Sequence, residues 1–195
     1  MPLKYLLIFS CGFFFVLGFS QRELELHVYQ QSFNLNSWYK LSKGDSIRIN
    51  QLKFYLGGGQ QYHLVDAEDT SSFTLPFSGD SLIIGMDSLS NTAGILTGPY
   101  DPLLGMYWAW NTGYIQLKVS GEFAIDHAIK TFEYHIGGYR SPYLTCQTII
   151  SNSGKVQHVQ LERLFESLPL SQVPRIMLPG AEALAIHKAF VVCFE

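Results

Sequence analysis

The sequence lacks the residue tracts that mark several classes of protein. Only 15% of its 195 residues are charged, and its 13 lysines and arginines form no basic tract. Proteins that bind nucleic acid use such tracts to neutralise phosphates, so nucleic acid is not an expected partner. After residue 20, no apolar run reaches the roughly 20 residues that a membrane-spanning helix needs. We therefore expect no integral membrane span beyond that point.

The sequence also lacks the local motifs of common enzymes and metal sites. It contains no GxSxG motif, no glycine-rich phosphate loop and no EF-hand loop. None of its six histidines forms HxH, HxxxH or HExxH, so a metal site would draw its ligands from separate segments. The acidic stretch LVDAEDTSS is more typical of turns than of a catalytic carboxylate pair. We expect a protein that is not an enzyme.

Cysteine is scarce, with three residues in the chain. Cys11 lies in the N-terminal apolar segment, which leaves Cys146 and Cys193 in the rest of the chain. In an exported protein such a pair is a candidate disulfide. A bridge of this span would stabilise the fold by about 4 kcal/mol on the loop-entropy model. The sequence does not show whether the two thiols meet.

The N-terminal segment predicts a signal peptide. Lys4 precedes an apolar run over residues 5–19, which is shorter than a membrane span and ends in a small-x-small pattern before Gln21. The alternative is a lipoprotein signal with Cys11 as the lipidated residue. The bulky Phe9 and the apolar residues beyond the cysteine argue against it. We expect export to the periplasm or cell envelope.

We divide the chain into a signal peptide, residues 1–20, and one domain, residues 21–195. Without Lys4 the chain has 12 basic and 16 acidic residues, so the net charge of the domain is −4. Short runs of alternating apolar and polar residues, separated by clusters of Gly, Asn, Asp, Ser and Pro, predict an all-β, antiparallel β-sandwich. The expected strands are 23–30, 45–56, 61–65, 81–86, 114–119, 130–136, 146–150 and 155–161.

Three irregular features interrupt this pattern. The alternation changes parity at Asn50, which predicts a β-bulge. Residues 87–105 are long for a connection, and loops of this length are often functional. Residues 67–79 show no obvious core pattern. Short helices are expected at residues 161–168 and, near the C-terminus, 181–190.

Two of the three tryptophans lie one residue apart, in MYWAWNTGYIQLKV. If residues 108–119 form one unbroken strand, Trp108 and Trp110 share its solvent-facing side. If a bulge or turn at residues 111–113 reverses the alternation, both rings are buried instead. Packing is the commoner role of such a pair in β proteins. The alternation alone leaves both arrangements open.

His135 belongs to the polar side of its predicted strand. In KTFEYHI, the apolar Phe132, Tyr134 and Ile136 alternate with Thr, Glu and His135. Two glycines follow, which permit a sharp turn or a close approach of the backbone. A single histidine in such a place is most often an ordinary surface residue.

Several segments together resemble the MbnP family, in its Bacteroidetes-type branch. They are QLKFYLGG, YHLVDAED, IGMDSLSNTAG, LTGPYDPLLGMYWAWNTGYIQLKVSG and FEYHIGGY, followed by PRIMLPG. The resemblance implies a sandwich-like domain that holds one copper ion outside the cytoplasm. It also implies a partner, a relative of the MbnH-type di-haem cytochrome c peroxidases. In characterised members that partner oxidises a tryptophan to kynurenine, on which copper binding depends.

The resemblance also implies particular residues. Trp110 is the first candidate for the kynurenine position and Trp108 the second, while His135 and then His27 are candidate metal ligands. Opening an indole ring yields an aniline nitrogen and a ketone, so a side chain that only donated a hydrogen bond gains ligand atoms. With imidazole nitrogen they suit copper. The tail LAIHKAFVVCFE departs from the family pattern, which leaves His187 and Cys193 as lineage-specific ligands or as accidents.

The alternative function is a metal-free binding module of the cell envelope. Tyr107, Trp108, Trp110 and Tyr114 would then form an exposed aromatic platform for a glycan or another protein. Burial of the aromatic rings separates this hypothesis from the copper hypothesis.

Overall fold

The structure of the protein is a computed structural model that describes residues 21–58, 61–68, 70–76, 79–109, 111–150 and 156–194. The predicted signal peptide and Trp110 lie outside the described residues. Among the residues that are described, no helix combines the length and the apolar character needed to span a membrane.

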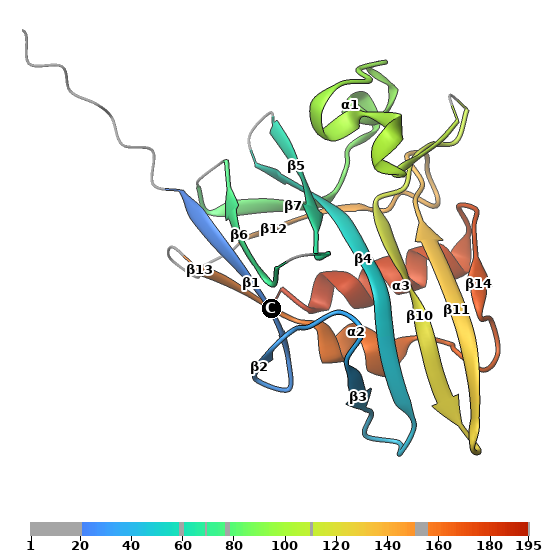
Figure 1. Cartoon of the computed structure of the whole chain (residues 1–195). Helices are drawn as coiled ribbons and strands as arrows, with labels where there is room; N and C mark the ends of the chain where they lie inside the picture. Colours follow the sequence, from blue (N-terminus) through green and yellow to red (C-terminus); the bar gives the residue numbers. More distant parts are fainter. Residues whose placement is uncertain are drawn as a thin grey trace, which may run out of the picture.

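The larger sheet runs along the molecule and contains most of the predicted strands (Figure 1). Its described strands follow the order β12, β7, β4, β10, β11 and β14, and β3 and β5 also pair with β4. Their bounds are β3 (Trp38–Lys40), β4 (Ser46–Gly58), β5 (Gln61–Asp66), β7 (Ser81–Gly85), β10 (Leu117–Ile125), β11 (Ala128–Ile136), β12 (Cys146–Ile150) and β14 (Arg175–Ile176).

The smaller sheet is built around the first strand of the domain. In it β1 (Arg22–Val28) pairs with β2 (Gln31–Ser32) and with β6 (Ser72–Leu75), both antiparallel. On its other edge β1 pairs in parallel with β13 (Val156–Gln160). The antiparallel β-sandwich is thus confirmed in outline, with parallel pairs at β1–β13 and β11–β14. The strand β6 lies in the segment for which the sequence predicted no core element.

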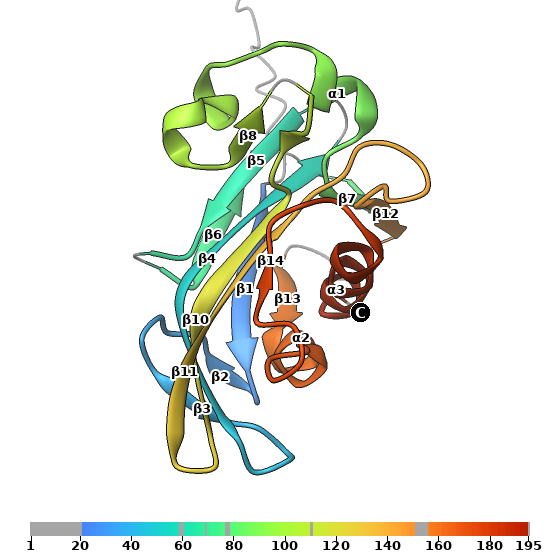
Figure 2. The same ribbon diagram turned by 90° about the vertical axis from the view of Figure 1, so that its right-hand side faces the viewer.

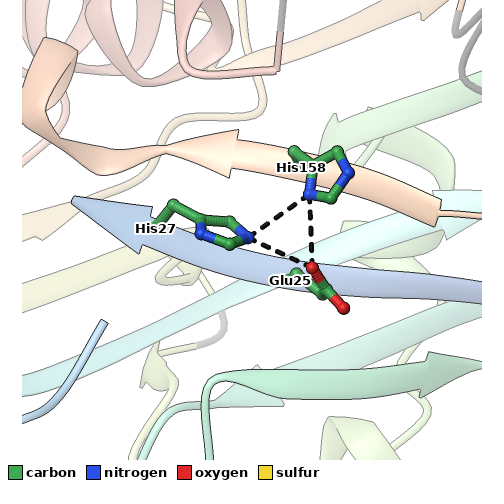
Figure 3. A group of neighbouring side chains, drawn as sticks. All are labelled: Glu25, His27 and His158. Atoms are coloured by element: carbon green, nitrogen blue, oxygen red, sulfur yellow. Dashed lines mark hydrogen bonds and ion pairs between the residues drawn. The ribbon is translucent and has the colours of Figure 1, made fainter. Parts of the chain in front are cut away.

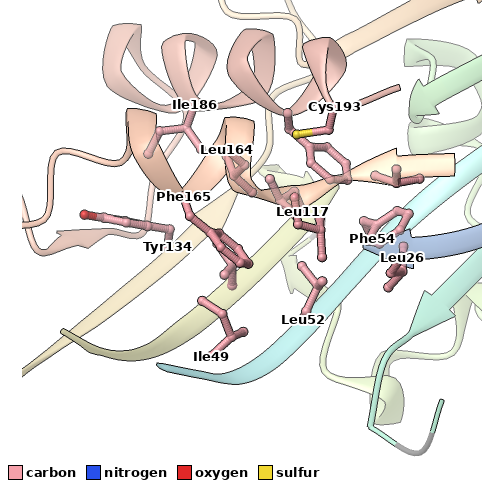
Figure 4. Packing of buried hydrophobic residues seen from close by; sticks show 14 of the residues in the cluster. Leu26, Ile49, Leu52, Phe54, Leu117, Tyr134, Leu164, Phe165, Ile186 and Cys193 are labelled. Atoms are coloured by element: carbon pink, nitrogen blue, oxygen red, sulfur yellow. The ribbon is translucent and has the colours of Figure 1, made fainter. Parts of the chain in front are cut away.

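One hydrophobic core joins the two sheets and two helices (Figure 4). From β1 the core receives Leu24, Leu26 and Val28, and from β11 it receives Tyr134 and Ile136. Figure 2 shows α2 (Leu161–Ser167) and α3 (Ala181–Val192) on the side of the large sheet where β1 and β13 lie. Because alternate residues of a strand face opposite sides, Glu25 and His27 of β1 and His135 of β11 point away from this core.

The predicted β-bulge is present in β4. Ser120 of β10 pairs with Gln51, and the next residue, Gly121, pairs with Ile49, so Asn50 is left over. The extra residue shifts the alternation by one, which keeps Leu52 on the core side like Ile49 before it. The glycine permits this, because a Cβ on Gly121 would lie only 2.0 Å from the carbonyl oxygen of Arg48.

The long connection before the tryptophans contains three short helical segments, α1 (Ser88–Thr92), η1 (Gly98–Tyr100) and η2 (Pro102–Leu104). The side chain of Asp87 caps α1 by accepting a hydrogen bond from the backbone N–H of Ser90 at 2.8 Å. Figure 1 shows this connection at one end of the large sheet. It brings the chain to β8 (Tyr107–Ala109), which carries Trp108.

Candidate functional site

The tryptophan segment is a hairpin of its own. Strand β8 pairs with β9 (Gly113–Tyr114) through a turn that includes residues 111 and 112, where the N–H of Thr112 donates to the carbonyl of Ala109 at 3.2 Å. Gly113 has φ 75°, in the left-handed region that favours glycine. The unbroken strand over residues 108–119 is therefore wrong, and the turn at residues 111–113 is confirmed.

Trp108 is half-buried and packs against a second hydrophobic cluster that includes Tyr55, Met106 and Tyr114. Its ring also lies against the backbone of Gly137, where an added Cβ would come within 2.8 Å of a ring carbon. The indole Nε1 is buried and finds no hydrogen-bond partner among the described residues. Because Tyr114 is only 2% exposed, these rings do not form the exposed aromatic platform of the alternative hypothesis.

His135 lies next to the end of β11, on the side away from the core, and is nevertheless buried at 7% exposure. It lies opposite Lys118 of β10. Its Nε2 is 3.2 Å from a carboxylate oxygen of Glu133, but within the described chain that nitrogen makes no aligned hydrogen bond. Burial lowers the pKa of His135 and the charge of Lys118 lowers it further, while Glu133 acts in the opposite direction. The ring is thus held in its neutral, metal-binding form.

Gly137 connects His135 with Trp108. It follows the histidine by two residues, so it continues the same outward face of the strand, and the indole covers it. Two ring nitrogens are buried and unpartnered within the described chain, Nε2 of His135 and Nε1 of Trp108, and the segment that carries the histidine meets the indole at Gly137. The imidazole can bind a metal as it stands, whereas an indole N–H is only a donor. Trp110 lies outside the described residues, so its predicted modification stays a prediction.

His27 lies elsewhere, on the smaller sheet. It occupies β1 beside Glu25 and close to His158 of β13 (Figure 3). The strands that carry His27 and His135 turn their alternate residues into the same core. The two histidines therefore leave the core on opposite sides, and the structure does not bring them to one ion. It places His27 in one potential metal-binding group with Glu25 and His158 instead.

The C-terminal residues flagged by the sequence belong to the core. His187 is buried in α3, and burial lowers its pKa to about 4. Cys193 is also buried, which raises the pKa of its thiol to about 12. It and Cys146 are free thiols, so the candidate disulfide is not formed. A neutral buried histidine and a protonated buried thiol are packing residues rather than accessible ligands.

Sequence reasoning missed Glu25 and His158 as partners of His27. Glu25 had a detectable pattern, because it precedes the histidine by two residues and so shares its face of the strand. His158 lies 131 residues further along the chain. No local pattern reveals the parallel pairing of β1 with β13 that brings it there.

Comparison with known proteins gives a single assignment. The family model described as MbnP matches residues 20–174, which include both the tryptophan hairpin and His135. No curated protein and no solved structure matches the chain. The match ends before α3 and the tail that departs from the family pattern. Since it covers most of the sequence, the chain belongs to the MbnP family.

Proposed function

We propose that this protein is an exported, non-catalytic copper-binding protein, whose ion is held on the outer face of the large sheet by His135 and an oxidised tryptophan. The family is associated with copper. The observation that carries the proposal is the position of Trp108, whose ring covers Gly137 two residues after a buried, unprotonated histidine. Both ring nitrogens lack hydrogen-bond partners among the described residues, as expected for groups that await a further ligand or a modification.

The unmodified residues fit a copper ion only in part. His135 offers one imidazole nitrogen, a good copper donor. Lys118 lies opposite His135, and its positive charge disfavours binding of a cation. Burial and the nearby Lys53 lower the pKa of Lys118, which reduces this repulsion. Conversion of Trp108 or Trp110 to kynurenine would add an aniline nitrogen and a ketone oxygen. Copper would then bind after the modification and not before it.

The modification balances with peroxide as the oxidant. The C2–C3 double bond of the indole is cleaved as two oxygen atoms are gained from two molecules of hydrogen peroxide, each reduced to water. Hydrolysis then releases C2 as formate and leaves the aniline nitrogen free. A di-haem peroxidase of the MbnH type, the partner that the family resemblance implies, would catalyse this oxidation.

Access for such a partner is provided by the connection that precedes the hairpin. Leu89 and Leu103 are exposed there at 80% and 93%, and the neighbouring Ile95 and Leu96 are each about half exposed. Large apolar side chains exposed on one connection make it a candidate for a surface that another protein covers. We place the peroxidase contact here, next to the tryptophans.

The proposal is tested by mass spectrometry and copper titration of protein made with its peroxidase. We expect a gain of about 4 Da on Trp108 or Trp110, because one carbon is exchanged for one oxygen atom. His135→Ala should remove the copper ion held at the large sheet, whereas His27→Ala, on the small sheet, should leave that ion bound. Unmodified tryptophans in protein made with an active peroxidase, together with the same number of bound copper ions per chain in His135→Ala as in the wild type, would overturn the proposal.

A further inference from the structure

We propose a second metal site, distinct from the copper centre above, in which Glu25, His27 and His158 bind one divalent transition-metal ion of the Zn(II) or Cu(II) class. The site lies on the outer face of the small sheet. It needs neither a modified tryptophan nor a peroxidase, so it goes beyond the proposed function and stands on separate observations.

The β1–β13 pair places the three side chains together. Glu25 and His27 are two residues apart on β1 and share its outer face. The parallel register sets Glu25 directly opposite His158 on β13. Figure 3 shows the two rings and the carboxylate turned toward one another across the two strands. Ligands on adjacent paired strands are held more firmly than ligands on loops.

The distances between the ligand atoms suit one ion. Nε2 of His27 lies 3.2 Å from Oε2 of Glu25, and Nδ1 of His158 lies 3.3 Å from the same oxygen. The two ring nitrogens are 3.3 Å apart. In a tetrahedral site with bonds of about 2.0 Å, neighbouring donor atoms are about 3.3 Å apart. The three atoms therefore form a triangle of the size of one face of such a site.

Hydrogen bonds alone do not explain this triangle. Each facing ring nitrogen carries either a proton or a lone pair, and an ionised Glu25 only accepts. If both nitrogens are protonated, the contact between His27 and His158 joins two donors. If only one is protonated, a contact with the carboxylate joins two acceptors. A cation above the triangle satisfies all three atoms at once, with both nitrogens unprotonated.

The site is accessible and its charge favours a cation. The side chains of His27, Glu25 and His158 are exposed at 19%, 37% and 53%. The solvent side is thus free for water as a fourth ligand, as in zinc sites with three protein ligands. Glu23 adds a second carboxylate to the same face of β1. Two imidazoles and a carboxylate form a donor set that both Zn(II) and Cu(II) accept.

The test uses the purified full-length domain made without a peroxidase, so that no modified tryptophan is present. Titration with ZnCl₂ against a chromophoric chelator should show one bound ion per chain. His158→Ala and Glu25→Gln should each weaken binding beyond the roughly 10–100-fold loss that changes around metal ligands cause. The matched controls Glu68→Gln, an exposed carboxylate away from this sheet, and His135→Ala should bind zinc like the wild type. Circular dichroism verifies that all variants fold.

A crystal soaked in zinc provides the structural readout. An anomalous peak within coordination distance of all three side chains supports the site. Zinc binding that is unchanged in both His158→Ala and Glu25→Gln, or a peak that lies only elsewhere on the chain, overturns it. The outcome is separate from that of the proposed function. His135→Ala should lose copper at the large sheet and keep zinc at the small sheet, whereas His158→Ala should lose the zinc and keep that copper.

Discussion

His27 and His135 each occupy the next-to-last position of a strand, and each points away from the same core. Their surroundings differ. His135 is buried, with Lys118 opposite and the ring of Trp108 against Gly137, two residues further along the chain. His27 lies on an open sheet face beside a carboxylate and a second histidine. We therefore propose two kinds of metal chemistry for one strand position.

The difference shows what each face still needs before it binds a metal. The small sheet has three donor atoms together and needs only the ion. The large sheet has one neutral imidazole and a neighbouring indole, so it needs a covalent change before a second donor exists. A protein with both faces would bind a divalent ion on the small sheet as soon as it folds, and copper on the large sheet only after oxidation. The predictions below test this contrast, beginning with the largest expected effect.

Acid should weaken both faces together, because it destabilises the core that they share. Burial lowers the pKa of His187 to about 4, against an ordinary value near 6.5. Between these values the unfolded chain binds the extra proton, so stability falls as pH falls from about 6.5 to 4, by roughly 3 kcal/mol in total. Urea unfolding of His187→Leu should show a shallower acid loss than wild type. Parallel curves would contradict this.

Gly137→Ala should damage the large-sheet face and leave the small-sheet face unchanged. The new Cβ would come within 2.6 Å of the Tyr114 carbonyl oxygen and 2.8 Å of the Trp108 ring. We expect a stability loss of about 1–3 kcal/mol, typical of overpacking, with altered tryptophan fluorescence and weaker copper binding. Zinc binding should be retained. Thr131→Ala, an exposed change on the same strand, is the control and should leave copper binding unchanged.

Leu103→Ser should affect only the oxidation step. Leu103 is 93% exposed on the connection that we assign to the peroxidase contact. Its loss should slow peroxidase-dependent modification by about 10-fold, since a central apolar contact is worth about 1–2 kcal/mol. Copper binding by protein already modified should not change. Ile150→Ser, equally apolar and 77% exposed on β12, is the control. Equal slowing by both variants would remove the proposed contact.

Glu133→Gln should have the smallest effect. Glu133 lies 3.2 Å from His135 and 3.3 Å from Arg175. Its neutralisation leaves the positive charges of Arg175 and of Lys118, which pairs with His135, to oppose an incoming cation. We expect copper affinity to fall a few-fold and stability to change by less than about 0.5 kcal/mol, because this carboxylate is well exposed. Glu122→Gln, on the neighbouring strand, should leave copper affinity unchanged. Competition titration with a copper chelator measures both.

The parts of the fold that local alternation determines were predictable. The strand over residues 146–150, the bulge at Asn50 and the outward position of His135 all follow from the spacing of apolar residues. The hairpin at the tryptophans was one of two arrangements that the sequence allowed. The hairpin is possible because residue 113 is a glycine: a Cβ there would come within 1.9 Å of the Asn91 side chain.

The features that the sequence did not predict depend on distant contacts. Strand β6 has only four residues and is defined by its pairing with β1. The free thiols were undecided because chain separation says nothing of the distance between them in space. The histidine triangle required the parallel pairing of β1 with β13, which is the contact that local patterns predict least well.

That pairing also has a consequence for biogenesis. If the protein is exported, as we propose, His27 reaches the far side of the membrane long before His158, which follows 131 residues later. Contacts between such distant segments form late. The small-sheet site would therefore bind a metal ion only after translocation is complete. A chain arrested midway would lack His158 on the far side and could not assemble the site there.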